Sequence, residues 1–271
     1  MTPTTLPFDP SNAIRIPDLD TPVYRIMSLR YFRSMLAKPE LVLIRPKMWP
    51  DPFENVLLDC SVGSVSNPRK PLEFFDRVLA EIYAQSWSIT QESDTLWRAY
   101  SWVENDKATN RNKWPDNAGV KIRSTPRKLL EALWRRCPAS DPAETCFIGR
   151  VRYMSTAELW EHVNTEVQRH GLAAFSGGHG HAEAVLLKRA AFSYESEIRL
   201  IYVEPRSHGF SGELLPIAID LPSVVDEVSF DPRLLPAEQK LREEEARTLG
   251  YFGVFGVSEL YQRVLMTFLL P

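Results

Sequence analysis

The chain has 271 residues, of which 44% are hydrophobic and 25% are charged, and its formal charge is -3. This is ordinary globular composition, which excludes a largely disordered chain, and the small net charge gives no general attraction to nucleic acid. No apolar run approaches the roughly 20 residues that cross a bilayer, and residues 1–10 lack the basic and apolar regions of a signal peptide. We therefore expect a cytoplasmic protein that does not enter a membrane.

The metal-binding residue types are sparse. Cys60, Cys137 and Cys146 are odd in number and show no CxxC spacing, which predicts reduced thiols rather than a disulfide framework or a zinc site. His179 and His181 lie in a glycine-rich stretch, but no cysteine or third histidine lies at a supporting spacing. We therefore expect no metal.

The first half of the chain predicts alternating strands and helices. Residues 1–20 are rich in proline and aspartate, which indicates an extended lead-in to a single α+β domain over residues 21–271. We expect a mixed, largely antiparallel sheet, whole or split in two, flanked by helices. The patterns predict a strand at 23–27, a helix at 29–36, a strand at 41–44, a rigid loop at 49–54, a helix at 71–87, and a strand at 119–125.

The second half continues in the same way. Ser124 or Thr125 can cap a helix that begins near Pro126, and Ser155 with Glu158 forms a capping box. The remaining patterns predict a strand at 147–153, a helix at 155–171, a flexible loop at 176–181, a short helix at 181–189, a strand at 198–203, a charged helix at 237–249 and a final strand at 264–270.

Two glutamates at the start of a late strand are the strongest candidates for chemistry. If Glu195 and Glu197 are both extended, their carboxylates leave the same face, within about 7 Å of each other. Such a pair raises one pKa or requires a cation, which is how a general base or a charge-stabilising carboxylate is prepared. Arg199 continues the alternation and can pair with Glu197. The alternative interpretation is a surface ladder of glutamate and arginine on an edge strand.

An arginine in the first predicted strand also needs an explanation. Arg25 follows Tyr24 in an otherwise apolar run, and a guanidinium there must meet an anion or lose desolvation energy. Its rigid donor fork fits carboxylate and phosphate alike, so it can bind a pyrophosphate or form a structural ion pair with Glu195 or Glu197.

Aromatic and basic residues give less specific signals. Aromatic side chains are dense within about thirty residues, which suits either a cleft that stacks a nucleobase or nicotinamide ring, or simply a core, and for most of them we favour the core. Basic residues on two predicted strands can line a phosphate-binding sheet face. The aromatic residues are Trp87, Trp97, Tyr100, Trp102 and Trp114, and the basic residues are Lys121, Arg123, Arg150 and Arg152.

An ordered set of motifs spans residues 21 to about 235. The motifs are Val23-Tyr24-Arg25, Asp51-Pro52-Phe53-Glu54, Leu96-Trp97 with Tyr100, Gly119-Val120-Lys121-Ile122, and Tyr194-Glu195-Ser196-Glu197-Ile198-Arg199-Leu200-Ile201. In this order they resemble a bacterial family known as domain of unknown function 2971. Members usually show a Phe-Asn pair where this chain has Trp49-Pro50.

A second, looser resemblance bears on chemistry. An arginine on the first strand, Ser-Thr after a middle strand and Glu-x-Glu before a late strand resemble the pattern of ADP-ribosyltransferases, although Pro126 replaces the third serine of the motif. The resemblance implies an ADP-ribosyltransferase-like fold with NAD as substrate and no metal. It further implies that Arg25 holds the pyrophosphate, Ser124 or Thr125 orders the site, Glu197 stabilises the oxocarbenium-like ribose and binds its 2′-hydroxyl, and Glu195 selects or deprotonates the acceptor. Tyr24, Trp97, Tyr100 and Tyr194 are then the candidate aromatic contacts to NAD.

Three hypotheses follow. The first is an NAD-dependent ADP-ribosyltransferase that modifies protein or nucleic acid. One version of this hypothesis is a toxin or phage-defence effector with a neutralising or complex partner. The second is a non-enzymatic binding or sensor module with a buried ion network of Arg25, Asp51, Glu54 and Arg199. The third is an RNA- or DNA-binding or nuclease-like protein that uses the basic strands and the tryptophans.

Overall fold

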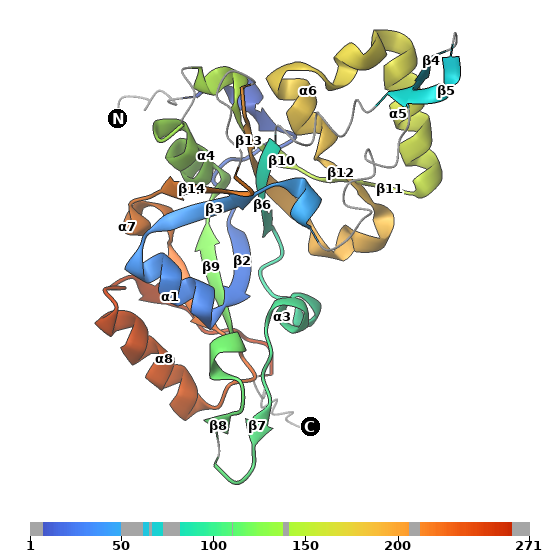
Figure 1. Ribbon diagram of the computed structural model, residues 1–271. Coiled ribbons are helices and arrows are strands. Elements are labelled where there is room, and N and C mark those ends of the chain that lie inside the picture. The colour runs from blue at the N-terminus through green and yellow to red at the C-terminus, as the bar shows by residue number, and fades with distance from the viewer. Residues whose placement is uncertain are drawn as a thin grey trace, which may run out of the picture. The chain divides into compact units, whose positions relative to one another are not determined.

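The computed structural model describes residues 8–49, 62–64, 67–72, 82–109, 111–137, 141–205 and 212–261. The chain is of the α+β class, with mostly antiparallel strands flanked by helices, which confirms the predicted fold class (Figure 1). It divides into two compact units, a first unit of Met1–Val23, Glu40–Ile89 and Ser124–Asp220 and a second unit of Tyr24–Pro39, Thr90–Arg123 and Leu221–Pro271. The single domain over residues 21–271 stays a prediction.

The strand that carries Glu197 lies inside the sheet of the first unit. This strand, β13 (Glu197–Val203), is antiparallel to β10 (Cys146–Arg150) on one side and to β6 (Ile82–Ser88) on the other. All seven residues of β13 are buried, which is expected for a strand that is paired on both sides and covered on both faces. The sheet also contains β1 (Ala13–Ile14), parallel to β10, and β3 (Glu40–Ile44), antiparallel to β6 and to β14 (Leu214–Ala218).

Helices cover this sheet. Both α4 (Pro126–Arg135) and α6 (Gly177–Ala184) contact β10 and β13, and they lie on opposite sides of these strands in Figure 1. The longest helix of the first unit, α5 (Thr156–His170), contributes Leu159 and Val163 to a core that it shares with α6 and the sheet. Burial of these apolar faces positions the segments that lead into β13.

Two further pairs of strands belong to the first unit. The most important for the site is a parallel pair, β11 (Arg152–Met154) with β12 (Leu187–Arg189), because β12 leads directly into the 3₁₀ helix η7 (Ala190–Glu195). A second pair consists of β4 (Val62–Ser64) and β5 (Asn67–Leu72), which are antiparallel.

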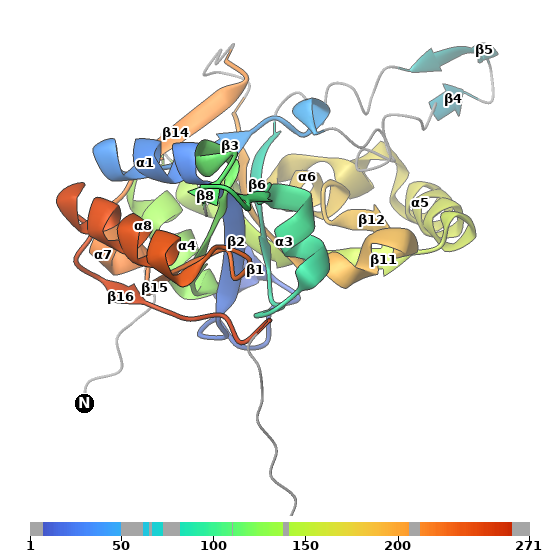
Figure 2. The same ribbon diagram turned by 90° about the horizontal axis from the view of Figure 1, so that it is seen from below.

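The second unit has its own strands and helices. In the sheet order β2-β9-β15-β16, β9 and β15 are antiparallel and β16 is parallel to β15. Helices α1 and α8 lie side by side in both views, and Arg33 Nε of α1 lies 2.5 Å from Glu245 Oε1 of α8 (Figures 1 and 2). The bounds are β2 (Val23–Ser28), α1 (Leu29–Ala37), α3 (Asp94–Tyr100), β7 (Asn105–Asp106), β8 (Arg111–Asn112), β9 (Gly119–Ser124), α7 (Leu221–Val224), β15 (Glu227–Phe230), α8 (Pro236–Thr248) and β16 (Val254–Phe255).

Short 3₁₀ helices connect many of these elements. They begin with proline at several positions, where the fixed φ of proline suits the first helical turn. None of the helices in the described ranges is both long enough and apolar enough to cross a bilayer. Within the described ranges, the 3₁₀ helices other than η7 are Pro10–Asn12, Pro46–Met48, Pro115–Asn117, Pro142–Glu144 and Gly171–Phe175.

Three predicted elements are wrong over residues that the structure describes. The helix predicted at 71–87 is wrong at both ends, where residues 71–72 belong to β5 and residues 82–87 to β6, and its residues 73–81 lie outside the described ranges. Six of the seven residues of β6 are buried, and a strand that is buried on both faces loses the alternation that identifies strands. The predicted loop at 176–181 and helix at 181–189 are instead helix α6 followed by strand β12. The predicted strand at 264–270 lies outside the described residues.

Candidate functional site

A sharp turn separates the two glutamates. Glu195 is the last residue of η7, Ser196 adopts a left-handed conformation with φ 46° and ψ 54°, and Glu197 is the first residue of β13. The expectation that Glu195 and Glu197 are both extended is therefore wrong. The Ser88 hydroxyl donates to Glu195 O at 2.7 Å, and Ile89 N donates to Ser196 O at 3.1 Å, so strand β6 holds this turn in place.

The turn brings both carboxylates to one ammonium group. Lys188 Nζ donates to Glu195 Oε2 at 2.6 Å and to Glu197 Oε1 at 2.5 Å. The Lys188 side chain is 0% exposed, against 13% for Glu195 and 6% for Glu197. The two glutamates therefore share a cation from β12, as a close carboxylate pair requires.

Sequence reasoning missed Lys188, although a signal was present. Residues 184–187 are apolar and lead directly to this lysine, and an ammonium group that ends a buried run must find an anion. The partners could not be identified from spacing, because β12 belongs to a two-stranded sheet separate from the one that contains β13.

Arg199 supplies the second cation. Its Nε donates to Glu197 Oε2 at 2.7 Å, which is the pair that the alternation of β13 predicts, and its Nη1 donates to Val185 O at 2.6 Å. The guanidinium carbon lies 4.2 Å from the centre of the Trp49 ring, which adds a cation–π contact. Ser86 Oγ also donates to Glu197 Oε2, at 3.3 Å. Glu197 is thus bonded to two cations and a hydroxyl group at once.

The two carboxylates have different proton affinities. Burial, together with the hydrogen bond to Glu197, raises the pKa of Glu195 to about 7. Burial alone would also raise the pKa of Glu197, but the charge of Arg199, the hydrogen bond with Glu195 and the charge of Lys188 hold that pKa well below its usual value. Glu197 is therefore ionised at neutral pH while Glu195 exchanges its proton there.

Two tyrosines border the pair. Glu197 N donates to Tyr153 OH at 2.8 Å, and burial followed by the charge of Glu197 raises the pKa of Tyr153, so this hydroxyl stays neutral. Tyr194 is 46% exposed, and burial followed by the charge of Glu195 raises the pKa of its hydroxyl. Glu195 and Tyr194 therefore form the part of the cluster that lies nearest to solvent.

The other predicted contacts to NAD are distributed over both units. Arg25 is half-buried and Tyr24 is buried, both on β2 in the second unit, whereas the glutamates belong to the first unit. A joint site of Arg25 with Glu195 and Glu197 stays a prediction. Asp51 and Glu54 lie outside the described residues.

The predicted Ser124-Thr125 motif lies where β9 meets α4, and it caps the helix. Thr125 Oγ1 accepts from Lys128 N at 3.3 Å, which confirms a predicted cap of α4, and Ser124 is fully buried at the end of β9. Trp97 is fully buried, as its alternative assignment to the core predicts, while Tyr100 is 52% exposed.

Of the four basic residues predicted to line a sheet face, Lys121 is buried and paired, whereas Arg150 is exposed. Lys121 is 5% exposed, and its Nζ donates to Glu92 Oε1 at 2.5 Å and to Gln91 O at 2.9 Å. It also lies 5.5 Å from the Tyr24 ring and 5.7 Å from the Trp97 ring. A lysine committed in this way within the second unit has no free charge for a phosphate.

The histidine-containing stretch forms part of α6. His179 is exposed and its ring lies 6.1 Å from that of Phe147, while His181 is buried. Among the described residues, no group of three or more His, Cys, Asp or Glu side chains is arranged to hold a metal ion.

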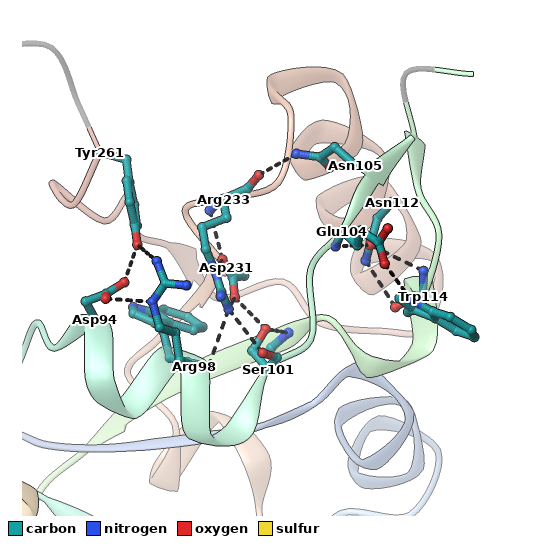
Figure 3. A network of polar contacts seen from close by, with 12 residues as sticks. Asp94, Arg98, Ser101, Glu104, Asn105, Asn112, Trp114, Asp231, Arg233 and Tyr261 are labelled. Carbon is teal, nitrogen blue, oxygen red and sulfur yellow. Dashed lines mark hydrogen bonds and ion pairs between the residues drawn. The ribbon is translucent and has the colours of Figure 1, made fainter. Parts of the chain in front are cut away.

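A second buried charge centre lies in the second unit (Figure 3). The Asp231 carboxylate, 0% exposed, accepts from Arg233 Nη2 at 2.6 Å and from the hydroxyl of Ser101. Arg233 Nη2 also donates to Ser101 O at 3.1 Å, and Ser101 Oγ accepts from Gly119 N at 2.6 Å. Because every partner belongs to this unit's own scaffold, the centre ties the end of α3 to β9 and β15.

Comparisons with known proteins give weak likenesses. No family model matches the chain, so its resemblance to domain of unknown function 2971 stays a prediction, and no curated protein matches it. DarT of Thermus sp. 2.9 in complex with ADP-ribosylated ssDNA is 10% identical, with a TM-score of 0.37, over 91% of this chain and 98% of that chain. The same protein in complex with NAD+ is 11% identical, with a TM-score of 0.35, over 88% and 96% of the two chains. Likenesses of this size leave the function to be argued from the site.

Proposed function

We propose that the chain is an ADP-ribosyltransferase-like enzyme that uses NAD as its donor and modifies a protein or a nucleic acid. The observation that carries the proposal is the glutamate pair on Lys188, in which one carboxylate stays ionised and the other exchanges its proton near neutral pH. Transfer from an N-glycoside needs both states, an anion for the positive charge that develops on the sugar and a base for the acceptor.

The proposed roles follow from these protonation states. Glu197 supplies the negative charge that stabilises the oxocarbenium-like ribose. Glu195 is the base, because its side chain is the more exposed of the two and its pKa is raised to about 7. Tyr194 is exposed, directly precedes Glu195 and feels its charge, so it is the aromatic contact best placed for a ligand at this pair.

The reaction balances without a metal or an oxidant. The bond between ribose C1′ and the nicotinamide nitrogen breaks, and nicotinamide leaves with the bonding electrons as a neutral base. A nucleophilic oxygen or nitrogen of the acceptor forms the new bond to C1′, and its proton passes to Glu195. Arg25 would bind the pyrophosphate of NAD, and Ser124 with Thr125 would order the site.

The test is the release of nicotinamide from NAD in the presence of protein and single-stranded nucleic-acid acceptors. We expect wild-type turnover to fall at least about a hundredfold in Glu197→Gln, because the charge that stabilises the transition state is lost. Glu161→Gln, an exposed carboxamide substitution on α5, is the control and should retain full turnover. A wild-type protein that releases no nicotinamide at any pH would refute the proposal.

A second candidate is a non-enzymatic binding module, and one observation favours it. Lys188 and Arg199 are 0% exposed, and a network buried this completely can serve to fix a fold. This candidate predicts that Glu195→Gln and Glu197→Gln both lower the melting temperature. Turnover lost with the melting temperature retained would exclude it.

The proposed enzyme would be toxic if its acceptor were essential to a cell. In that case it would act as a toxin or defence effector, and a neutralising partner would accompany it. Expression in a bacterial host should then stop growth for the wild type and not for Glu197→Gln. Equal growth of the two strains would refute the toxic role and leave the enzymatic proposal unaffected.

A further inference from the structure

Lys188 occupies a position between the two carboxylates that no other described residue shares. It reaches them from β12, whereas Glu195 ends η7 and Glu197 begins β13. An oxygen of each carboxylate lies on the same Nζ, at 2.6 Å and 2.5 Å, so the two oxygens are within about 5 Å of each other. The ammonium group is therefore the bridge of the pair.

The charges of the cluster balance only when Lys188 is included. Two carboxylates, of Glu195 and Glu197, face two cations, of Lys188 and Arg199, in a setting where the cations are fully buried. Without Lys188 the cluster would hold two carboxylates against one guanidinium, and one carboxylate would have to take up a proton.

The contacts distinguish the two carboxylates. Arg199 Nε and the Ser86 hydroxyl both donate to Glu197 Oε2, and Lys188 donates to Glu197 Oε1. Among the described residues, Tyr153 from β11 and Tyr194 from η7 are two further titratable groups on which the charge of Glu195 acts. Substitution of Lys188 should therefore change mainly the proton affinity of Glu195, because Lys188 is the cation that bonds this carboxylate.

We propose that Lys188 is a positioning residue of the reaction: it holds both carboxylates on one ammonium group, so that Glu197 remains an anion and Glu195 remains able to accept the proton of the acceptor. This inference rests on the proposed function for its catalytic meaning. Its effect on the carboxylates follows from the contacts alone, so the two can be tested separately.

The first measurement is the pH profile of NAD turnover in Lys188→Met. We expect the acidic limb of the profile to move up by about one pH unit or more, with turnover at pH 7 reduced about tenfold, because Glu195 stays protonated without its cation. Lys47→Met removes an exposed lysine of the same unit and should leave the profile unchanged. An unshifted profile in Lys188→Met would overturn the inference.

The second measurement does not depend on turnover. NMR of protein labelled at the glutamate carboxyl carbons follows the titration of Glu195, assigned by its absence from Glu195→Gln, and should give a pKa at least about one unit higher in Lys188→Met than in the wild type. If the wild type releases no nicotinamide but this shift occurs, the proposed function fails while the role of Lys188 in proton affinity stands. If the shift is absent, the inference fails in either case.

A third variant covers the possibility that Lys188→Met does not fold. Lys188→Met with Glu195→Gln removes one charge of each sign and should regain at least half of the melting temperature lost in Lys188→Met, because the remaining Glu197 and Arg199 are still paired. A double variant as unstable as the sum of the single ones would show that Lys188 and Glu195 are not coupled, and would overturn the inference.

Discussion

Arg199 lies two residues after Glu197 on β13, and its Nε donates to Glu197 Oε2 at 2.7 Å with both side chains buried. Period-two alternation places the two side chains on one face of the strand, and burial makes each the necessary partner of the other. The pair links the chemistry of the site to the stability of the first unit, so its removal has consequences that can be measured.

We predict that Arg199→Met lowers the free energy of unfolding by about 3 to 5 kcal/mol, because Glu197 keeps its charge and loses its guanidinium. Chemical denaturation followed by circular dichroism measures the change. In a double-mutant cycle with Glu197→Gln, the double variant should be more stable than the sum of the single changes implies. Additive changes would contradict the pairing.

A second prediction concerns the pH dependence of stability. The pKa of Glu195 rises from 4.5 to about 7 on folding, so the folded state binds the proton more tightly than the unfolded state. This contribution is fully present below pH 4.5 and is lost as the pH rises through about 7. Between these two pH values, the free energy of unfolding of the wild type should fall by on the order of 1 to 3 kcal/mol relative to that of Glu195→Gln. Denaturation of both proteins at several pH values measures it, and parallel curves would contradict it.

The sequence predicted the local features of the fold well. Ser155 and Glu158 form the expected capping box, with Glu158 N donating to Ser155 Oγ at 3.2 Å and Ser155 N donating to Glu158 Oε2 at 2.7 Å. The Arg199–Glu197 pair was equally local. Both depend on neighbours within three residues, where periodicity and capping rules apply directly.

Features that depend on tertiary structure could not be predicted from the sequence. The buried strand β6 has no alternation, so its aromatic and apolar residues also fit a helix face. The turn at Ser196 requires a residue in the left-handed conformation. A glycine at this position would have indicated such a turn, but a serine does not. Lys188 meets Glu197 only because β12 and β13 come together in the folded unit.

The buried centre of the second unit gives a third prediction (Figure 3). Asp231→Asn should lower the free energy of unfolding by about 2 to 4 kcal/mol, because Arg233 and the Ser101 hydroxyl lose the charge of a carboxylate that is 0% exposed. Glu104→Gln removes an exposed ion pair with Lys113 in the same region and should lower the free energy of unfolding far less than Asp231→Asn does. Denaturation of both variants provides the comparison, and similar costs would count against a structural role for Asp231.

The last prediction tests how closely the chain packs beside that centre. A Cβ on Gly119 would lie 2.6 Å from Ser101 Cβ and 3.0 Å from Trp97 Cζ3, closer than carbon atoms pack. Ser101 cannot withdraw freely, because its hydroxyl accepts from Gly119 N at 2.6 Å and donates to Asp231. Gly119→Ala should therefore lower the free energy of unfolding by about 1 to 3 kcal/mol, which denaturation measures.

A cycle with Ser101→Gly identifies the source of that cost. Removing the facing Cβ also removes the hydroxyl, so Ser101→Gly is itself destabilising, but it should make the added methyl group of Gly119→Ala less harmful by about 1 kcal/mol or more. Ser101→Ala keeps the Cβ and should give no such relief. If both substitutions relieve Gly119→Ala equally, the cost comes from the Ser101 hydroxyl rather than from the contact with the Ser101 Cβ, since only the Cβ distinguishes the two variants.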